Sequence, residues 1–139
     1  MKTQNGRTVL AAVAIALVIA APSFFAQSPL LSATIPFDFY IADKYFPAGT
    51  YTVAPQQNME AIRVFDSRGN SMFVLTSSQS ENRSVDWSRL VFHRYGDTTF
   101  LASIYWEGYR TGRDLAPSKT EKKLAGIGSS PNPVAVHLK

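Results

Sequence analysis

The sequence has 139 residues, a formal net charge of +4 and no cysteine, so neither a disulfide nor a thiolate metal site can stabilise it. Its length suits one domain, and stability must come from the packing of the core. The arginines are scattered singly along the chain, whereas nucleic-acid binding needs a clustered basic face, so the pattern argues against that function class.

Residues 1–26 have the pattern of a secretory signal. Two basic residues precede thirteen consecutive apolar residues at 9–21, and no acidic residue occurs among them. Because a spanning helix needs about 20 apolar residues and Pro22 interrupts this run, the pattern favours a cleaved signal over a transmembrane anchor. We expect cleavage after Ala26, with cleavage after Ser23 as the alternative. No cysteine follows the run, which excludes an N-terminal lipid anchor.

Export would deliver the mature domain to the periplasm or the extracellular space. Removal of the signal takes away two positive charges, which leaves a net charge of +2 (4 − 2). We expect a linker at 27–33, a β domain at 34–127 and a tail at 128–139. If the signal stays uncleaved, it is the one part of the chain that we expect to contact the membrane.

The first predicted hairpin lies near the start of the mature chain. Apolar residues at alternate positions in 35–41 give the period of a half-buried strand. The turn sequence Pro-Ala-Gly at 47–49 follows, and a second alternating segment occupies 50–53. These segments predict two antiparallel strands.

A second hairpin is predicted from 59–66 and 71–77, joined by a four-residue loop at 67–70. This pairing gives the hairpin an apolar face, made of Ile62, Val64, Phe73 and Leu75. The polar segment 78–86 that follows predicts the longest loop of the domain.

The strongest hairpin pattern covers 87–95 and 98–107, around the dipeptide Gly96-Asp97. Glycine at the first central position suits a type II′ turn. A two-residue loop sets the register and brings Trp87 and Trp106 to one face. The predicted pairs are Arg94–Thr99, His93–Phe100, Val91–Ala102 and Arg89–Ile104.

The C-terminal part predicts one short helix. Ser118 and Glu121 have the spacing of a capping box, and Gly126 provides a stop, so the helix is expected at 119–125. The last residues could dock as a strand or stay loose. We therefore expect an all-β fold: a single antiparallel meander of six or seven strands, as a barrel or sandwich, with one short C-terminal helix.

Four phrases of the sequence resemble a family of small secreted bacterial proteins of uncharacterised function. They are IPFDFYI at 35–41, FPAGTYTV at 46–53, RLVFHRYGDTTFL at 89–101 and SKTEKKLA at 118–125. The resemblance covers most of the mature chain. It implies export and a β-rich domain that ends in a short helix, and it implies no activity.

Catalytic and metal-binding motifs have little support in the sequence. A lone strand histidine such as His93 is more often structural than functional, and His137 lies in the tail. A structural zinc site needs about four ligands and has no cysteine to draw on, so we expect neither a metal nor another cofactor. The carboxylates stand at turns and strand ends, where they satisfy backbone donors, and we therefore expect no enzyme.

One group of side chains on the third hairpin has the potential to line a ligand site, because rings with polar tips on a sheet can form a pocket or a platform. The same rings also build ordinary β cores, which is their more frequent use. The group consists of Trp87, His93, Phe100, Tyr105 and Trp106.

These observations predict a non-catalytic exported module that acts by binding or structural association. Two alternatives stay open. One is a barrel that carries a small apolar ligand in a cavity lined by the aromatic group. The other is a small hydrolase, which would need a cleft that gathers His93 with a carboxylate and a hydroxyl. The expected partner is thus an envelope component or a small apolar ligand, and not a nucleic acid.

Overall fold

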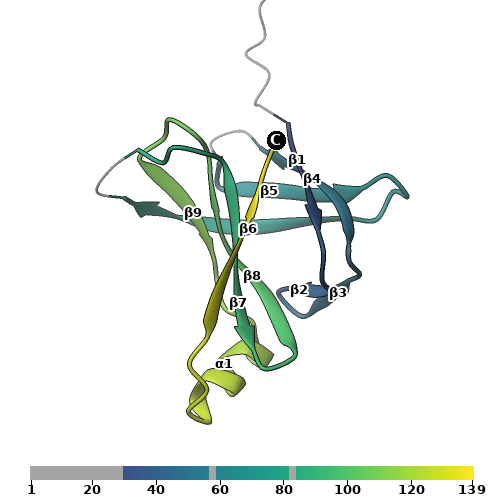
Figure 1. Ribbon diagram of the computed structural model, residues 1–139, viewed down its shortest axis with the longest axis vertical. Helices are drawn as coiled ribbons and strands as arrows, with labels where there is room; N and C mark the ends of the chain where they lie inside the picture. Colours follow the sequence, from purple (N-terminus) through teal and green to yellow (C-terminus); the bar gives the residue numbers. More distant parts are fainter. Residues whose placement is uncertain (1–29, 57–58, 82–83) are drawn as a thin grey trace, which may run out of the picture.

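The computed structural model describes residues 30–56, 59–81 and 84–139, so the expected signal segment lies outside the described residues. Ten strands and one helix make up the described part of the chain (Figure 1). Their bounds are β1 Leu31–Ile35, β2 Phe39–Ile41, β3 Lys44–Phe46, β4 Gly49–Pro55, β5 Ala61–Asp66, β6 Ser71–Ser80, β7 Arg89–Tyr95, β8 Thr98–Tyr105, β9 Thr111–Leu115, α1 Lys119–Gly126 and β10 Asn132–His137.

The strands form one mixed sheet in the order β1-β4-β5-β6-β9-β8-β2-β3, with β7 pairing with β8 and β10 pairing with β7. The ladders are antiparallel except for one parallel bridge, between Tyr40 of β2 and Phe100 of β8. Figure 1 shows β5 and β6 lying across the direction of β7, β8 and β10, so the sheet is strongly bent between two halves.

The prediction of an all-β fold with one short C-terminal helix is confirmed. The described residues form ten strands where six or seven were expected, partly because β2 and β3 have three residues each, too few to show a period. Simple meander order holds from β4 to β6, after which β9 pairs with β6. The sheet is open and not closed into a barrel.

Phe39 stands at the centre of an aromatic cluster in the core. The centroid of its ring lies 5.5 Å from that of Phe46, 5.1 Å from that of Tyr51 and 5.4 Å from that of Phe92. These rings come from β2, β3, β4 and β7, so the cluster joins both halves of the bent sheet. Each such contact contributes about 0.5–1.5 kcal/mol beyond the burial of area.

The hairpin of β7 and β8 follows the predicted register near its turn and departs from it farther along. Gly96 has a φ of +60°, as a type II′ turn requires. A register shift then skips Ala102, so that Val91 pairs with Ser103 instead. This β-bulge corrects the predicted pairs distant from the turn, because one strand carries an extra residue there.

The hairpin of β5 and β6 turns through three residues, 67–69, where four were predicted. The backbone N–H of Asp66 donates to the carbonyl of Asn70 at 3.0 Å, and Gly69 takes the left-handed conformation with a φ of +88°. Oδ1 of Asp66 accepts from the backbone N–H groups of Arg68 and Asn70, both at 2.9 Å, and its Oδ2 accepts from Nδ2 of Asn70. The aspartate therefore closes the shorter loop.

The shorter loop shifts the pairing of β5 with β6 by one residue, so that Arg63 pairs with Phe73. Because side chains alternate along a strand, this shift moves Phe73 and Leu75 to the opposite face from Ile62 and Val64. The prediction that the four share one face is therefore wrong. Ile62 and Val64 are buried, whereas Phe73 is 60% exposed and Leu75 is 78% exposed.

The predicted tail docks as strand β10 along the edge of β7. Beyond β10, Lys139 and Ser32 exchange two backbone hydrogen bonds of 2.9 Å, and the N–H of Leu138 donates to the carbonyl of Ser88. The last residues of the chain thus lie beside β1, which begins inside the segment expected to be a linker.

Close packing of β8 against β9 depends on Gly112. A Cβ atom built on this residue would overlap two ring carbons of Tyr105. The aromatic ring of Tyr105 occupies the space that a side chain would need. Burial raises the pKa of the Tyr105 hydroxyl, and a hydrogen bond with Glu81 raises it further.

The closed loop generates a prediction on acid stability. Hydrogen bonds from Asn70 lower the pKa of Asp66 below its usual 3.8 in the folded protein. A lowered folded pKa means that this stabilisation is complete above the unfolded pKa and is lost as the pH falls through the folded one. Asp66→Ala should lower the Tm by a few degrees at pH 7, and the Tm values of wild type and variant should converge near pH 2.

Asp97→Ala, in the other tight turn, is the control. A Tm gap that is equal at both pH values would contradict this account.

The packing of Gly112 generates a second prediction. Gly112→Ala should destabilise the protein by about 1–3 kcal/mol, because the added methyl group must displace a buried ring. Gly126→Ala is the matched control, since no heavy atom lies within 4 Å of its added Cβ. Urea unfolding monitored by tryptophan fluorescence measures both. Equal urea midpoints for the two variants would show that β8 and β9 move apart enough to accommodate the methyl group.

Candidate functional site

The five side chains predicted to line a ligand site do not meet in one described cavity. Phe100 and Trp106 are buried in the core. Tyr105 packs against Gly112, and the guanidinium of Arg89 lies 4.5 Å from the centroid of its ring. All three rings are therefore used in packing, and they lend no support to the carrier hypothesis, which stays a prediction.

Trp87 lies at the surface and contacts the end of the chain. Its ring stacks on that of His137, with centroids 5.3 Å apart and planes inclined by 21°. The indole remains about half exposed. The stack of Trp87 on His137 thus holds the end of β10 in place, since the neighbouring backbone of Ser88 and Leu138 is hydrogen-bonded as well.

His93 forms the most specific polar contact of the predicted group. Its Nδ1 lies 3.0 Å from Oε1 of Glu121, and the hydroxyl of Tyr95 donates to the same oxygen at 3.4 Å. Glu121 is buried, while the His93 side chain is 37% exposed. The capping box is confirmed in one direction only: the Ser118 hydroxyl accepts from the N–H of Glu121, whose carboxylate turns inward toward the sheet.

A cleft of about 290 Å³ lies where α1 covers the sheet. Ser77 of β6 pairs with Asp114 of β9, which pairs with Ser103 of β8, so these three residues form a row across the strands. His93 and Glu121 also line this space. We call it the helix cleft, and it gathers a histidine, two carboxylates and two hydroxyls. Oδ1 of Asp114 is buried there without a hydrogen-bond partner.

The helix cleft holds only part of the set of contacts that catalysis needs. A carboxylate at Nδ1 orients the imidazole of His93 and leaves Nε2 as a base. Within the described chain, no hydrogen bond joins this histidine to Ser77 or Ser103. No group of three or more metal-ligating side chains was found in that same part of the protein. The cleft therefore has a base and its orienting group, without an aligned nucleophile.

The exposed face of β5 and β6 forms a second feature, which we call the β5–β6 surface. It consists of Arg63, Phe65, Phe73 and Leu75. The guanidinium carbon of Arg63 lies 4.8 Å from the ring centroid of Phe65 and 5.7 Å from that of Phe73. Phe73 and Leu75 stand two residues apart on one strand, so their exposed side chains are neighbours. The surface combines apolar area with one planar cation.

A third feature adjoins this surface where β6 changes its pairing partner from β5 to β9. A cleft of about 480 Å³ opens there, which we call the Arg113 cleft. It is lined by Glu60, Leu75, Thr76, Ser77, Ser78 and Arg113.

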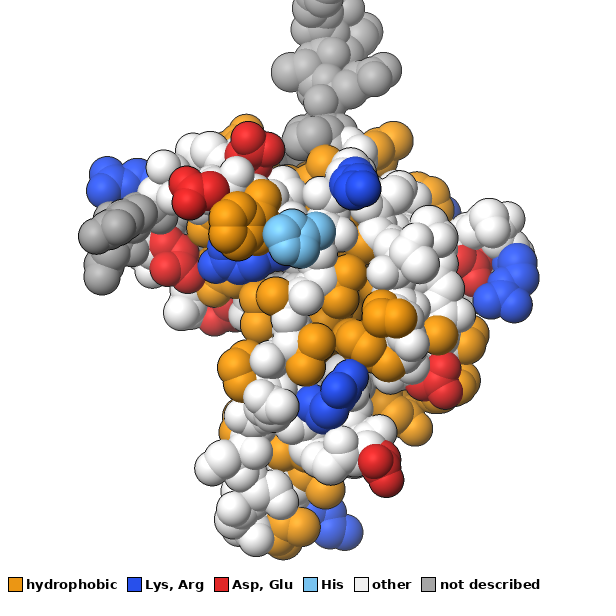
Figure 2. Space-filling view, in the orientation of Figure 1, with side chains coloured by type: hydrophobic (Ala, Val, Ile, Leu, Met, Phe, Trp, Pro, Cys, Tyr) orange, Lys and Arg blue, Asp and Glu red, His pale blue; other side chains and the backbone are white. Residues whose placement is uncertain are grey.

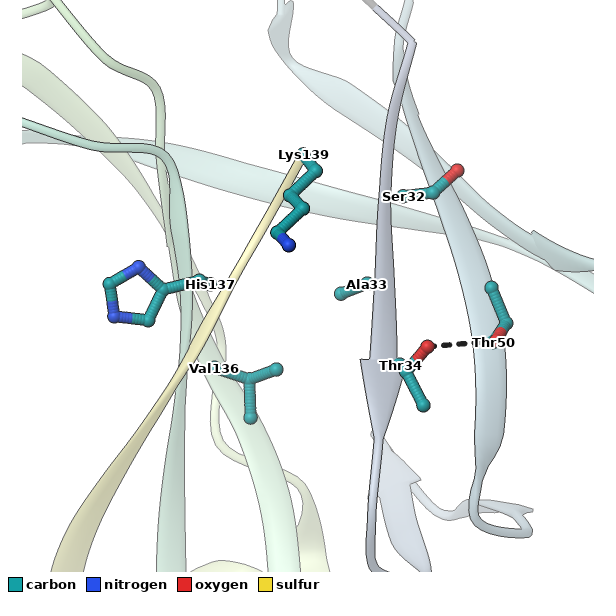
Figure 3. A pocket seen from close by; sticks show the side chains of 7 residues that line it. All are labelled: Ser32, Ala33, Thr34, Thr50, Val136, His137 and Lys139. Carbon is teal, nitrogen blue, oxygen red and sulfur yellow. Dashed lines mark hydrogen bonds between the residues drawn. The ribbon is translucent and has the colours of Figure 1, made fainter.

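β1 and β10 diverge from the Ser32–Lys139 pair and leave a wedge-shaped cleft of about 460 Å³ between them. Figure 3 shows Ala33 and Val136 directed toward the wedge and His137 directed away from it. Apolar side chains form much of the surface in this region (Figure 2). No acidic side chain is among the described residues that line the wedge, which lies between β1 and β10 where the sheet stays open.

Sequence reasoning missed the β5–β6 surface because it assigned a four-residue loop. The sequence Asp-Ser-Arg-Gly-Asn at 66–70 carries a signal for the shorter loop. Aspartate favours the first position of a type I turn, and glycine suits the left-handed residue that follows in a three-residue hairpin loop. Glu121 was identified as a helix cap, but its contact with His93 depends on how α1 docks.

The comparisons with known proteins gave no match. No protein-family model matches the chain, and no similar protein was found among curated sequences or solved structures. Within the described residues, no helix is long and apolar enough to cross a membrane.

Proposed function

We propose that this protein is a non-catalytic exported module that binds another protein through its β5–β6 surface. The observation that carries the proposal is the exposure of Phe73 and Leu75, which are 60% and 78% accessible on adjacent outward positions of β6. Arg63 lies beside them. Aromatic residues, methionine and arginine are enriched at protein interfaces, whereas lysine and glutamate are depleted.

The energetics of burial favour association at this surface. Single exposed apolar side chains are common in soluble proteins. Adjacent large apolar side chains form a patch, and such a patch marks an interaction site. Full burial of a phenylalanine or leucine side chain contributes about 1.5–3 kcal/mol. Two such side chains therefore supply the centre of an interface, with Arg63 as a further anchor.

The exported location is part of the same proposal. It is supported by the apolar run at 9–21 and by the basic residues before it. Because the chain has no cysteine, no thiol or disulfide of its own responds to the redox state of the compartment.

Photo-crosslinking tests the proposed surface. We expect a photoreactive phenylalanine analogue at position 75, introduced in the native host, to give a covalent adduct of defined mass. The same analogue at Thr50, an exposed residue of β4, is the control. Phe73→Ser combined with Leu75→Ser should abolish the adduct from a probe at position 63 and leave the Tm almost unchanged, because both residues are exposed. Equal crosslinking from positions 75 and 50 would contradict the proposal.

Ester hydrolysis is a second candidate function, favoured by one observation. The helix cleft gathers His93, hydrogen-bonded to Glu121, with the hydroxyl of Ser103. A base oriented by a carboxylate can activate a hydroxyl that moves into reach, and such contacts often tighten only with substrate.

The hydrolase candidate is tested with p-nitrophenyl acetate. If it holds, His93→Gln and Ser103→Ala should each lower turnover at least a hundredfold, while Ser80→Ala leaves it unchanged. Wild-type release of nitrophenolate that is no faster than that of the His93→Gln protein would eliminate this candidate.

A further inference from the structure

Arg113 of β9 is a buried cation without a carboxylate partner. Its strand pairs with β6, where Arg113 stands opposite Ser78, and the residue is 7% exposed. Nε donates to Oγ1 of Thr76 at 3.0 Å, Nη2 donates to the carbonyl of Thr76 at 3.1 Å, and Nη1 donates to Oγ of Ser78 at 2.6 Å. All ten acidic residues lie in the described part of the chain, and none forms an ion pair with this guanidinium.

This arrangement leaves the charge of Arg113 incompletely compensated. An arginine side chain stays protonated in proteins, so loss of the proton cannot remove the free-energy cost of burying its charge. Hydroxyl and carbonyl oxygens satisfy three of its five N–H donors, and two donors remain for another acceptor. A planar guanidinium with free donors matches the geometry of a carboxylate.

The position of Arg113 joins it to the β5–β6 surface. Leu75 belongs to that surface and also lines the Arg113 cleft. An occupant of the cleft would therefore meet an exposed leucine side chain and a buried cation at once. Arg113 also links β6 to β9 through its bonds to Thr76 and Ser78, and this structural role does not use the two remaining donors.

We propose that the Arg113 cleft binds a carboxylate side chain of the partner protein, next to an apolar residue that packs on Leu75. This inference rests on the proposed function and names the chemistry of the partner. The proposal rests on the charge complementarity between a buried cation and a carboxylate. Glu60 also lines the cleft, and its negative charge repels a multiply charged anion such as phosphate more strongly than a singly charged carboxylate.

Two matched peptides test the proposal. They are acetylated and amidated pentapeptides, Thr-Leu-Asp-Leu-Thr and Thr-Leu-Asn-Leu-Thr, which differ by one charge at nearly constant shape. We expect the aspartate peptide to shift the Nε–H signal of Arg113 and the backbone signals of 75–78 in 1H–15N NMR spectra. It should bind about tenfold more tightly than the asparagine peptide, since bonds between charged groups are stronger.

Variants locate the effect and guard against misfolding. Arg113→Lys keeps the charge but loses the planar fork, and it should reduce the preference for aspartate. Leu75→Ser changes an exposed side chain, so it should weaken both peptides equally while the fold is retained. Arg68→Gln, in an exposed turn, is the control for loss of a cation.

The outcomes separate this inference from the proposed function. Equal affinity for both peptides, or a preference for aspartate that is undiminished in the Arg113→Lys protein, would overturn the carboxylate site. Tighter binding of decanoate than of the aspartate peptide would also overturn it, because the ligand would then be a lipid. If the probe at position 75 still gives its adduct in these cases, the β5–β6 surface stands without a carboxylate contact. If that adduct is absent too, the proposed function fails.

Discussion

The carboxylate of Asp66 sets a constraint on which the arrangement of the sheet depends. By accepting from the backbone of Arg68 and Asn70, it closes a three-residue loop and fixes the register of β5 against β6. In a strand the side chains alternate, so a register change of one residue would exchange the buried and exposed sets. Ile62 fills the core and Leu75 faces solvent because the loop has this length.

Strand β6 transmits this register to the rest of the domain. Its ten residues pair first with β5 and then with β9, so the alignment chosen at the Asp66 loop continues to Ser77 and Ser78. Ser77 lines both the helix cleft and the Arg113 cleft. The exposed apolar residues, the buried cation and the polar row beneath α1 are therefore positions of one rigid strand and its neighbours.

Local patterns in the sequence predict the elements better than their assembly. The Gly96 turn and the Ser118 cap are set by neighbouring residues, and both form as predicted. The parallel bridge from Tyr40 and the contact of His93 with Glu121 join distant segments, so no local period encodes them. The candidate site could not be found from local patterns, because the burial of Arg113 without an acidic partner becomes visible only once β6 and β9 are aligned.

The meeting of Ser32 with Lys139 has a consequence for the order in which the domain forms. These residues are 107 positions apart (139 − 32), and their pair closes a loop that spans almost the whole described chain. A chain that is synthesised with its N-terminus first cannot form this contact until residue 139 has been added. Until β10 has also arrived, the edge of β7 has no covering strand, and an uncovered edge can pair with another chain. Docking of β10 thus covers an edge that would otherwise be open to pairing with another chain.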